Sequence, residues 1–298
     1  MSELKIDPSQ PVNAELSRLA VLLLDGAIAD LEVEPGRGID PEGVHDARKA
    51  LKRLRALVRL GRGALGTEAA QAENHAYRDL AHHLSSRRDA DAMVETVDRL
   101  QTAADHEDAD LAASLATLHH RLAEAATIGG QDDAEAVGAV RAGLLHARRR
   151  AEEWSGTGMG GPKATGWHLL EPGFARQYRQ GRDAFHALGE DPTDEQLHDW
   201  RKRVKDRWYH LEFLDEAWPK VLNATAKEVH HLADHLGDDH DLAELENQRG
   251  DGLSRVVREL IDVERARLQT EGRHLGRRVF AEPPKRLGQR FGAWWPHA

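Results

Sequence analysis

One stretch of the chain occurs twice, and this repeat is the strongest constraint on the fold. The residues HDARKALK at 45–52 return as HDWRKRVK at 198–205, shifted by 153 residues. A second block, LAHHLSSRRDAD at 80–91, returns as LADHLGDDHDLA at 232–243, shifted by 152 residues. Two blocks at almost the same shift predict that a unit of about 150 residues is duplicated within the chain.

The rest of the sequence is typical of an all-α protein. Apolar residues recur with the period of a helix, and no segment alternates convincingly with period two. Helices are expected in the first half, with the third longer or split, at residues 11–31, 41–60, 67–100, 107–127 and 133–154. Helices are expected in the second half at residues 172–188, 193–215, 219–247, 252–279 and 284–295. The Gly-rich segment 155–166 is the expected boundary, so the repeats are predicted to cover 11–154 and 167–296.

Composition excludes several classes of protein. The chain has no cysteine, which excludes disulfides, cysteine-ligated zinc and thiol catalysis. The longest apolar run, LAVLLL at 19–24, is far too short to cross a membrane, and the N-terminal residues do not resemble a leader. The cytoplasm is therefore the expected location. A formal net charge of -10 also argues against general affinity for nucleic acid.

The repeated helix nevertheless carries many cations, and they fall on one strip. A step of 100° per residue places Val44, Leu51 and Val58 on the core side. The strip beside this apolar face is formed by His45, Arg48, Lys49, Lys52, Arg55, Arg59 and Arg62, whereas Arg53 stands apart. The second copy repeats the start of the strip with His198, Arg201, Lys202 and Lys205.

Two other segments add rows of cations. Residues 141–150 place Arg141 and Arg148 near one face, and residues 174–185 space Arg176, Arg179 and Arg182 by three, with Tyr178 beside them. Solvated helix faces with acidic neighbours would explain a single row. Retention of the same phase in two copies favours a ligand instead, because cationic strips that are packed together repel unless an anion lies between them.

The anion is expected to be rich in phosphate. Arg and Lys suit phosphate oxygens, but the sequence has no phosphate-binding loop of the GxxxxGK[ST] type. Aromatic residues do not alternate with the cations, as they would on a surface that stacks bases. A repetitive ligand without bases, such as inorganic polyphosphate, fits these features best.

These segments resemble the CHAD domain family, the conserved histidine α-helical domain. The similarity rests on both HD segments, on LSSRRDAD at 84–91 and LGDDHDLA at 236–243, on FARQYRQGRDAF at 174–185, and on the ending GRRVFAEPPKRLGQRFGAWW at 276–295. The resemblance covers nearly the whole chain, as a single domain over 1–298. It implies two pseudo-symmetric four-helix bundles around a basic central channel that binds inorganic polyphosphate, without catalysis and without a cofactor.

The resemblance also implies which residues line the channel. The first rank is His45, Arg48, Lys49, Lys52, Arg55, Arg59, His198, Arg201, Lys202 and Lys205. The second rank is Arg78, Arg141, Arg148, Arg176, Tyr178, Arg179 and Arg182. The second copy departs from the first, because Trp208, Tyr209 and Glu212 stand where the first has Arg55, Ala56 and Arg59. Asp239 and His240 likewise replace Arg87 and Arg88, which leaves a phosphate role for Arg88 open.

Two other functions stay open at the level of sequence. Helical bundles can hold metals on Glu-x-x-His pairs, and this spacing occurs four times, as in Glu42/His45 and Glu195/His198. The neighbouring Arg and Lys would repel a divalent cation, however. A nucleic-acid backbone binder is the third class, although an enclosed channel would exclude a duplex. Anchoring to polyphosphate granules, protection of the polymer and targeting of a partner are all compatible with polyphosphate binding.

Overall fold

The computed structural model describes residues 4–32, 39–84, 88–104, 108–128, 134–156 and 165–295, and over these residues it is all-α, as predicted. Its α-helices are α1 Val12–Asp30, α2 Pro41–Leu60, α3 Arg62–Leu65, α4 Thr67–His82, α5 Arg88–Ala103, α6 Ala109–Ile128, α7 Ala134–Glu153, α8 Glu171–His186, α9 Asp194–Phe213, α10 Pro219–Arg249, α11 Arg255–Val279 and α12 Pro284–Trp294. The expected third helix is split into α4 and α5. Most of the predicted boundary segment, 157–164, lies outside the described residues.

The two helices that carry the HD segments, α2 and α9, begin where the sequence predicts. The side chain of Asp40 accepts a hydrogen bond from the backbone N–H of Glu42, and Pro41 takes the first helical position of α2. Thr193 and Gln196 form a capping box at the start of α9. These caps fix the first turn of each helix and therefore the direction in which the HD cations point.

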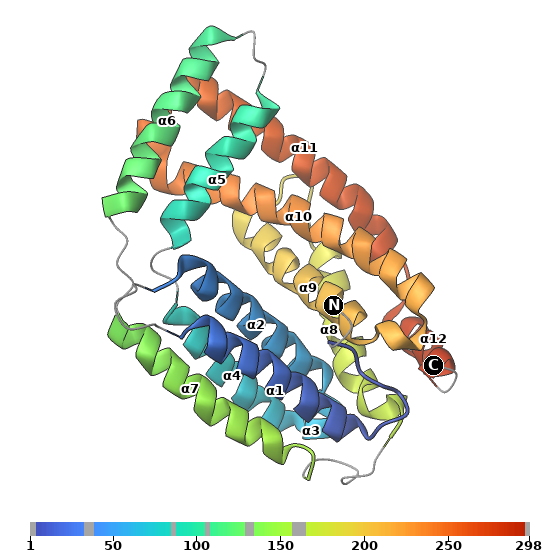
Figure 1. Cartoon of the computed structure of the whole chain (residues 1–298). Helices are drawn as coiled ribbons and strands as arrows, with labels where there is room; N and C mark the ends of the chain where they lie inside the picture. The colour runs from blue at the N-terminus through green and yellow to red at the C-terminus, as the bar shows by residue number, and fades with distance from the viewer. Residues whose placement is uncertain are drawn as a thin grey trace.

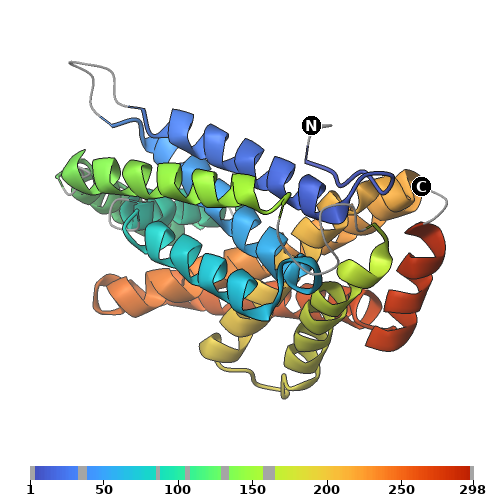
Figure 2. The same cartoon turned by 90° about the horizontal axis from the view of Figure 1, so that it is seen from below.

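A large core joins most of the helices. α1 packs on α2 and α7, and α2 packs on α4, which makes one group of four helices. α9 packs on α8 and α10, and α12 packs on α8. Figure 2 shows α1 and α7 on one side of the molecule and α8 and the start of α9 on the opposite side. The contacts of α2 with α8 and α9 make the core continuous between the two groups.

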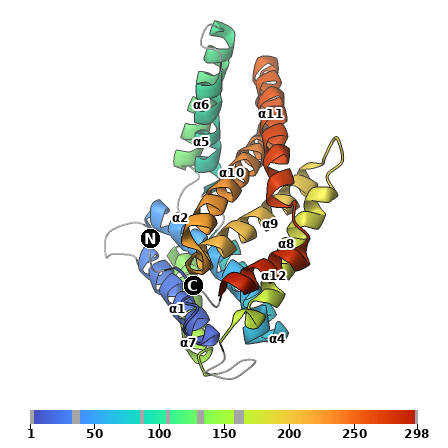
Figure 3. The ribbon, with the colours of Figure 1, turned by 90° about the vertical axis from the view of Figure 1, so that its right-hand side faces the viewer.

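The α5–α6 hairpin stands apart from the other helices of the first half. Figures 1 and 3 show it at one end of the molecule, beside α10 and α11. Its apolar residues, among them Val97, Leu100 and Leu115, form a second core with Leu245 of α10 and Ile261 of α11. α10, which is 31 residues and about 46 Å long, contributes to both cores and ties the hairpin to the rest.

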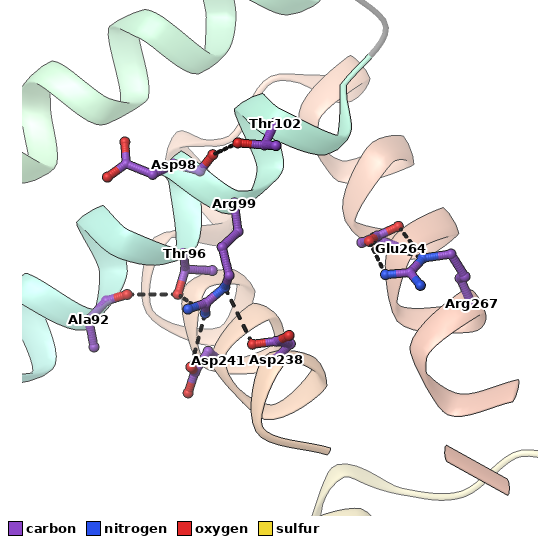
Figure 4. Close-up of polar contacts among 9 residues, drawn as sticks. All are labelled: Ala92, Thr96, Asp98, Arg99, Thr102, Asp238, Asp241, Glu264 and Arg267. Carbon is purple, nitrogen blue, oxygen red and sulfur yellow. Dashed lines mark hydrogen bonds and ion pairs between the residues drawn. The ribbon is translucent and has the colours of Figure 1, made fainter. Parts of the chain in front are cut away.

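Polar contacts fasten the hairpin to α10. The guanidinium of Arg99 lies 3.4 Å from Asp238 and 3.0 Å from Asp241, and it also donates to Thr96 on its own helix (Figure 4). Arg267 of α11 pairs instead within its own helix, with Glu264. The two α10 residues that contact Arg99 are next in sequence to Gly237 and His240. Gly237 and His240 face α9.

Candidate anion-binding site

Three predicted cations of α2 contact α4 or Leu84, which follows it. Arg48 Nη1 donates to the backbone oxygen of Leu84 at 2.9 Å. Farther along, Arg55 Nε and Arg59 Nη1 donate to Asn74 Oδ1 at 3.3 Å and 2.7 Å. Five predicted residues on this strip are half-buried, namely His45, Arg48, Lys52, Arg55 and Arg59. The strip therefore lies along the α2–α4 contact and is not a fully solvated face.

A cluster of arginines surrounds one buried carboxylate where α2 meets α9. Asp206 of α9 accepts from Arg59 Nη2 at 2.5 Å, and its other oxygen lies 3.8 Å from Arg203 Nη1. Burial lowers the pKa of Arg55, and the nearby cations Arg59, Arg78 and Arg203 lower it further, while Asp206 raises it. We call Arg55, Arg59, Arg78 and Arg203 the arginine cluster.

The charge of this cluster is only partly balanced. Arg78 is exposed and also pairs with its neighbour Asp79 at 2.8 Å. Asp206 is the carboxylate that contacts two members of the cluster, whereas Arg55 is bound to a neutral amide. Like charges at short range cost free energy, and the cost grows as water is excluded. An anion placed among these side chains would lower that cost and accept several charge-assisted hydrogen bonds.

The second strip lies between α9 and α10. The ring of His198 is 4.6 Å from the ring of His240, and Arg201 lies opposite Gly237. Burial lowers the pKa of His198 to about 4, and His240, Lys202 and Arg201 add to this shift. His198 is therefore neutral near pH 7, and its Nδ1 is buried without a hydrogen bond to the described residues. Lys205, one turn farther on, is half-buried.

The two repeated lysines occupy matching positions. Lys49 lies 2.8 Å from Asp46, and Lys202 lies 2.7 Å from Asp199, in each case one turn back on the same helix. Both lysines are exposed. Lys49 also lines a groove between α1 and α2, on the side of α2 that carries Arg53. These lysines are paired locally and do not contact Asp206.

The predicted arginines of α7 lie against α1. Arg148 contacts Asp25 at 2.5 Å and Glu152 at 2.7 Å, and the hydrogen bond to Asp25 raises the pKa of Arg148. Arg141 Nη2 lies 3.7 Å from Glu32. The structure therefore places these two cations beside acidic partners on the α1–α7 face and does not bring them to the arginine cluster.

The predicted residues of α8 have different surroundings. Tyr178 is buried, and its hydroxyl donates to the backbone oxygen of Glu282 at 2.9 Å. Arg182 Nε donates to the backbone oxygen of Phe280 at 3.2 Å. Tyr178 and Arg182 thus join α8 to the segment between α11 and α12, while Arg176 and Arg179 are exposed.

The analysis of the sequence missed one member of the cluster, Arg203, and the two residues that its arginines contact, Asn74 and Asp206. The repeat gives no signal for the two on α9, because a shift of 153 residues places Arg203 over Ala50 and Asp206 over Arg53. Arg203 also falls near the core side of its helix in the projection. It reaches the site because α8 and α2 both pack against α9.

Two ion pairs join α2 to α9, and the shift of 153 residues between the repeats exchanges their positions. Arg59 pairs with Asp206, and Arg53 Nη2 lies 3.6 Å from Glu212. A shift of 153 residues converts 59 into 212 and 53 into 206, so each pair occupies the positions of the other. Such exchange is what a two-fold relation between two helices produces. Duplication of the whole unit stays a prediction.

Two further searches concern the alternatives. Among the residues that the structure describes, no group of three or more His, Asp or Glu side chains is arranged to hold a metal ion. Within the same residues, every helix is too short or too polar to cross a membrane. The Glu-x-x-His spacings noted in the sequence therefore do not converge on a common centre there.

Comparison with known proteins identifies the family. A protein-family model described as the CHAD domain matches residues 22–250. The chain belongs to the CHAD domain family. A crystal structure of the CHAD domain from the plant Ricinus communis is similar to this structure over 94% of this chain and 95% of that chain, with 18% identity and a TM-score of 0.57. This likeness concerns the fold. No curated protein matches the chain.

Proposed function

We propose that this CHAD domain protein binds inorganic polyphosphate at the arginine cluster, with the HD strips of α2 and α9 as the adjoining surfaces. The observation that carries the proposal is the position of Arg55, which is half-buried, shares the oxygen of Asn74 with Arg59, and lies near Arg78, Arg203 and the carboxylate of Asp206. A chain of phosphates offers many oxygens in a row. It can therefore accept donors from several arginines and reduce their mutual repulsion at the same time.

A phosphate polymer fits the cluster better than a mononucleotide or a duplex. The aromatic pair of Trp208 and His230, with rings 4.0 Å apart, belongs to α9 and α10 and not to the strip of α2. The cluster also includes half-buried side chains such as Arg55 and Arg59, which a thin chain can approach more closely than a duplex can.

We further propose that binding is not accompanied by catalysis. Arginine stays protonated at neutral pH, and the carboxylate of Asp206 is held by Arg59 and Arg203, so the cluster supplies chiefly charge and hydrogen-bond donors. The protein would then act as an adaptor or a store for the polymer, and association with polyphosphate granules would follow from binding alone. A metal-dependent reaction is the competing function, and elemental analysis of the purified protein tests it: stoichiometric iron, manganese or zinc would contradict a purely binding role.

Calorimetry with long-chain polyphosphate tests the proposed site. The double variant Arg55→Gln/Arg78→Gln removes two cations from the cluster and leaves the Arg59–Asp206 pair in place. Its affinity should fall at least about tenfold, because each lost charge-assisted contact costs about 1.5 to 3 kcal/mol before the polymer readjusts. Affinity of the wild-type protein should also fall as salt is added.

A matched variant controls for net charge. Arg149→Gln/Arg255→Gln removes the same charge from exposed positions on α7 and α11, and it should bind polyphosphate like the wild-type protein. Equal affinities of the two double variants would place the ligand elsewhere. A second arm adds excess duplex DNA, and displacement of polyphosphate by DNA would favour the nucleic-acid alternative.

A further inference from the structure

A second group of cations lies outside the arginine cluster, near the C-terminus. Residues 273–295 contain six Arg or Lys and one acidic residue, Glu282, in a chain whose net charge is -10. That carboxylate is already paired, since Glu282 contacts Arg290 at 2.7 Å. The end of α11 and the whole of α12 are therefore strongly basic in an otherwise acidic protein.

Packing joins this segment to the arginine row of α8. The hydroxyl of Tyr178 donates to the backbone oxygen of Glu282, and Arg182 Nε donates to the backbone oxygen of Phe280. Farther along α12, Gly288 is close to the side chain of Glu171. Figure 3 shows α8, α12 and the end of α11 together on one side of the molecule. The helices that carry these cations therefore lie together.

Most cations on this surface differ from the predicted arginines of α7 in making no ion pair within the described residues. Arg148 is neutralised by Asp25 and Glu152. Six exposed side chains of α8, α11 and α12 make no ion pair within the described part of the chain: Arg176, Arg179, Arg277, Arg278, Lys285 and Arg286. We call these six residues the α8–α12 basic surface. Unpaired, exposed cations held on rigid helices attract a polyanion.

The basic surface is continuous with the arginine cluster through α8. Arg203 Nη1 of the cluster lies 3.5 Å from Gln177 Oε1, and Gln177 follows Arg176 in the sequence. At the start of α8, a Cβ on Gly173 would lie only 2.3 Å from the backbone oxygen of Arg59, so α8 passes directly over the end of α2. One helix therefore borders the cluster on one side and carries part of the basic surface on another.

We infer that the α8–α12 basic surface binds further phosphate units of the same polyphosphate chain whose first-bound segment occupies the arginine cluster. This inference rests on the proposed function. A polymer is the occupant that continuity favours, since one ligand must reach from a half-buried cluster to an exposed surface. An anionic membrane fits less well, because Leu287 and Phe291 of α12, and Trp295 just after it, are buried in the core and are not available for insertion.

The consequence is a dependence on chain length that the cluster alone would not give. A short anion such as tripolyphosphate fills the cluster and does not need the surface. A long chain engages both, and the second contact then forms at high effective concentration, which multiplies the affinity. Loss of the surface should therefore weaken the binding of long chains selectively.

The experiment compares two quadruple variants by calorimetry with tripolyphosphate and with long-chain polyphosphate. The surface variant is Arg277→Glu/Arg278→Glu/Lys285→Glu/Arg286→Glu. The matched control, Arg149→Glu/Lys220→Glu/Lys227→Glu/Arg249→Glu, makes the same change of charge at exposed positions scattered over α7 and α10. The surface variant should bind long chains at least about tenfold more weakly than the control, with tripolyphosphate affinity equal in the two.

Other results would overturn the inference. Equal long-chain affinities in the two variants would show that the surface takes no part, while the proposed function would stand. Retained polyphosphate binding with loss of binding to duplex DNA or to phosphatidylserine vesicles would assign the surface to a different partner. Failure of the wild-type protein to bind polyphosphate of any length would instead contradict the proposed function itself.

Discussion

The two HD helices begin alike and differ one turn later. In both, a lysine pairs with the aspartate one turn back, and an arginine faces the following helix of its own half, as Arg48 does at Leu84 and Arg201 at Gly237. Farther along, α2 carries Arg55 near Arg78, whereas the matching positions of α9 and α10 hold Trp208 and His230, with rings 4.0 Å apart.

This difference shows that packing and charge have separate requirements. The fold therefore accommodates either two cations or two aromatic rings at these positions of the HD helix and its neighbour. Only the first leaves a surplus of positive charge, which is concentrated beside Asp206. The positive charge of the site is therefore distributed unequally. α2 and α4 supply most of it, and α9 contributes Arg203 together with Asp206, whose carboxylate partly balances the charge.

The largest expected effect comes from removing that carboxylate. Asp206→Asn keeps the shape of the side chain but leaves Arg59 buried without its counter-charge, which should reduce the free energy of unfolding by about 3 kcal/mol at low salt. Added polyphosphate should restore stability, because it supplies the missing negative charge and binds the native state. Urea denaturation with and without the polymer measures both effects.

The exposed pair on the same helix provides the control. Asp199→Asn removes the partner of Lys202 and should change stability by less than about 0.5 kcal/mol. Similar losses in the two variants would mean that the contact of Asp206 is no more important than a surface pair.

A smaller effect concerns pH and again separates the two helices. His210 of α9 lies fully inside the core with Nε2 3.0 Å from the backbone oxygen of Ala56, and burial lowers its pKa to about 4. The matching residue of α2 is Leu57. In the unfolded chain His210 is protonated near its ordinary pKa of 6.5. The free energy of unfolding should therefore fall by about 2 kcal/mol between pH 7 and pH 5 because of His210 alone.

Denaturation of His210→Gln across this range measures the contribution. Glutamine retains an N–H for the carbonyl but does not titrate, so the variant should show a flatter decline than the wild-type protein. His198, with its lowered pKa, contributes in the same direction, and this part should be reversed by a bound polyanion. Parallel curves for wild type and variant would show that His210 does not control the acid sensitivity.

The smallest expected effect tests whether charge can be restored to the second helix. Trp208→Arg recreates the position of Arg55 on α9 and should raise the affinity for polyphosphate about fivefold, the equivalent of roughly 1 kcal/mol. Trp218→Arg is the control, since Trp218 is exposed and packs on Trp294 of α12. An equal gain in both variants would indicate a general effect of net charge.

Much of the fold follows from local patterns in the sequence. Apolar periodicity predicted the helices to within about three residues at most ends, because this signal acts within one or two turns. The position of the α5–α6 hairpin did not follow in the same way. Its apolar stripe needs a partner, but nothing in the stripe states that the partner is α10 and α11 rather than the helices of its own half.

The site was only partly predictable for the same reason. Helical projection placed Arg55 and Arg59 on one strip, and both donate to Asn74, while Arg59 also contacts Asp206. Projection could not distinguish them from Arg141 and Arg148, which have similar spacing but face the acidic residues of α1. The choice between a paired and an unpaired cation depends on the neighbouring helix, which lies far away in the sequence.

A crystal structure of the protein with bound polyphosphate tests the central claim most directly. The account predicts phosphate units within hydrogen-bond distance of the guanidinium groups of Arg55 and Arg203, between α2, α4 and α9. Phosphate density confined to the α1–α7 face or to other surfaces, with the arginine cluster unoccupied, would contradict it.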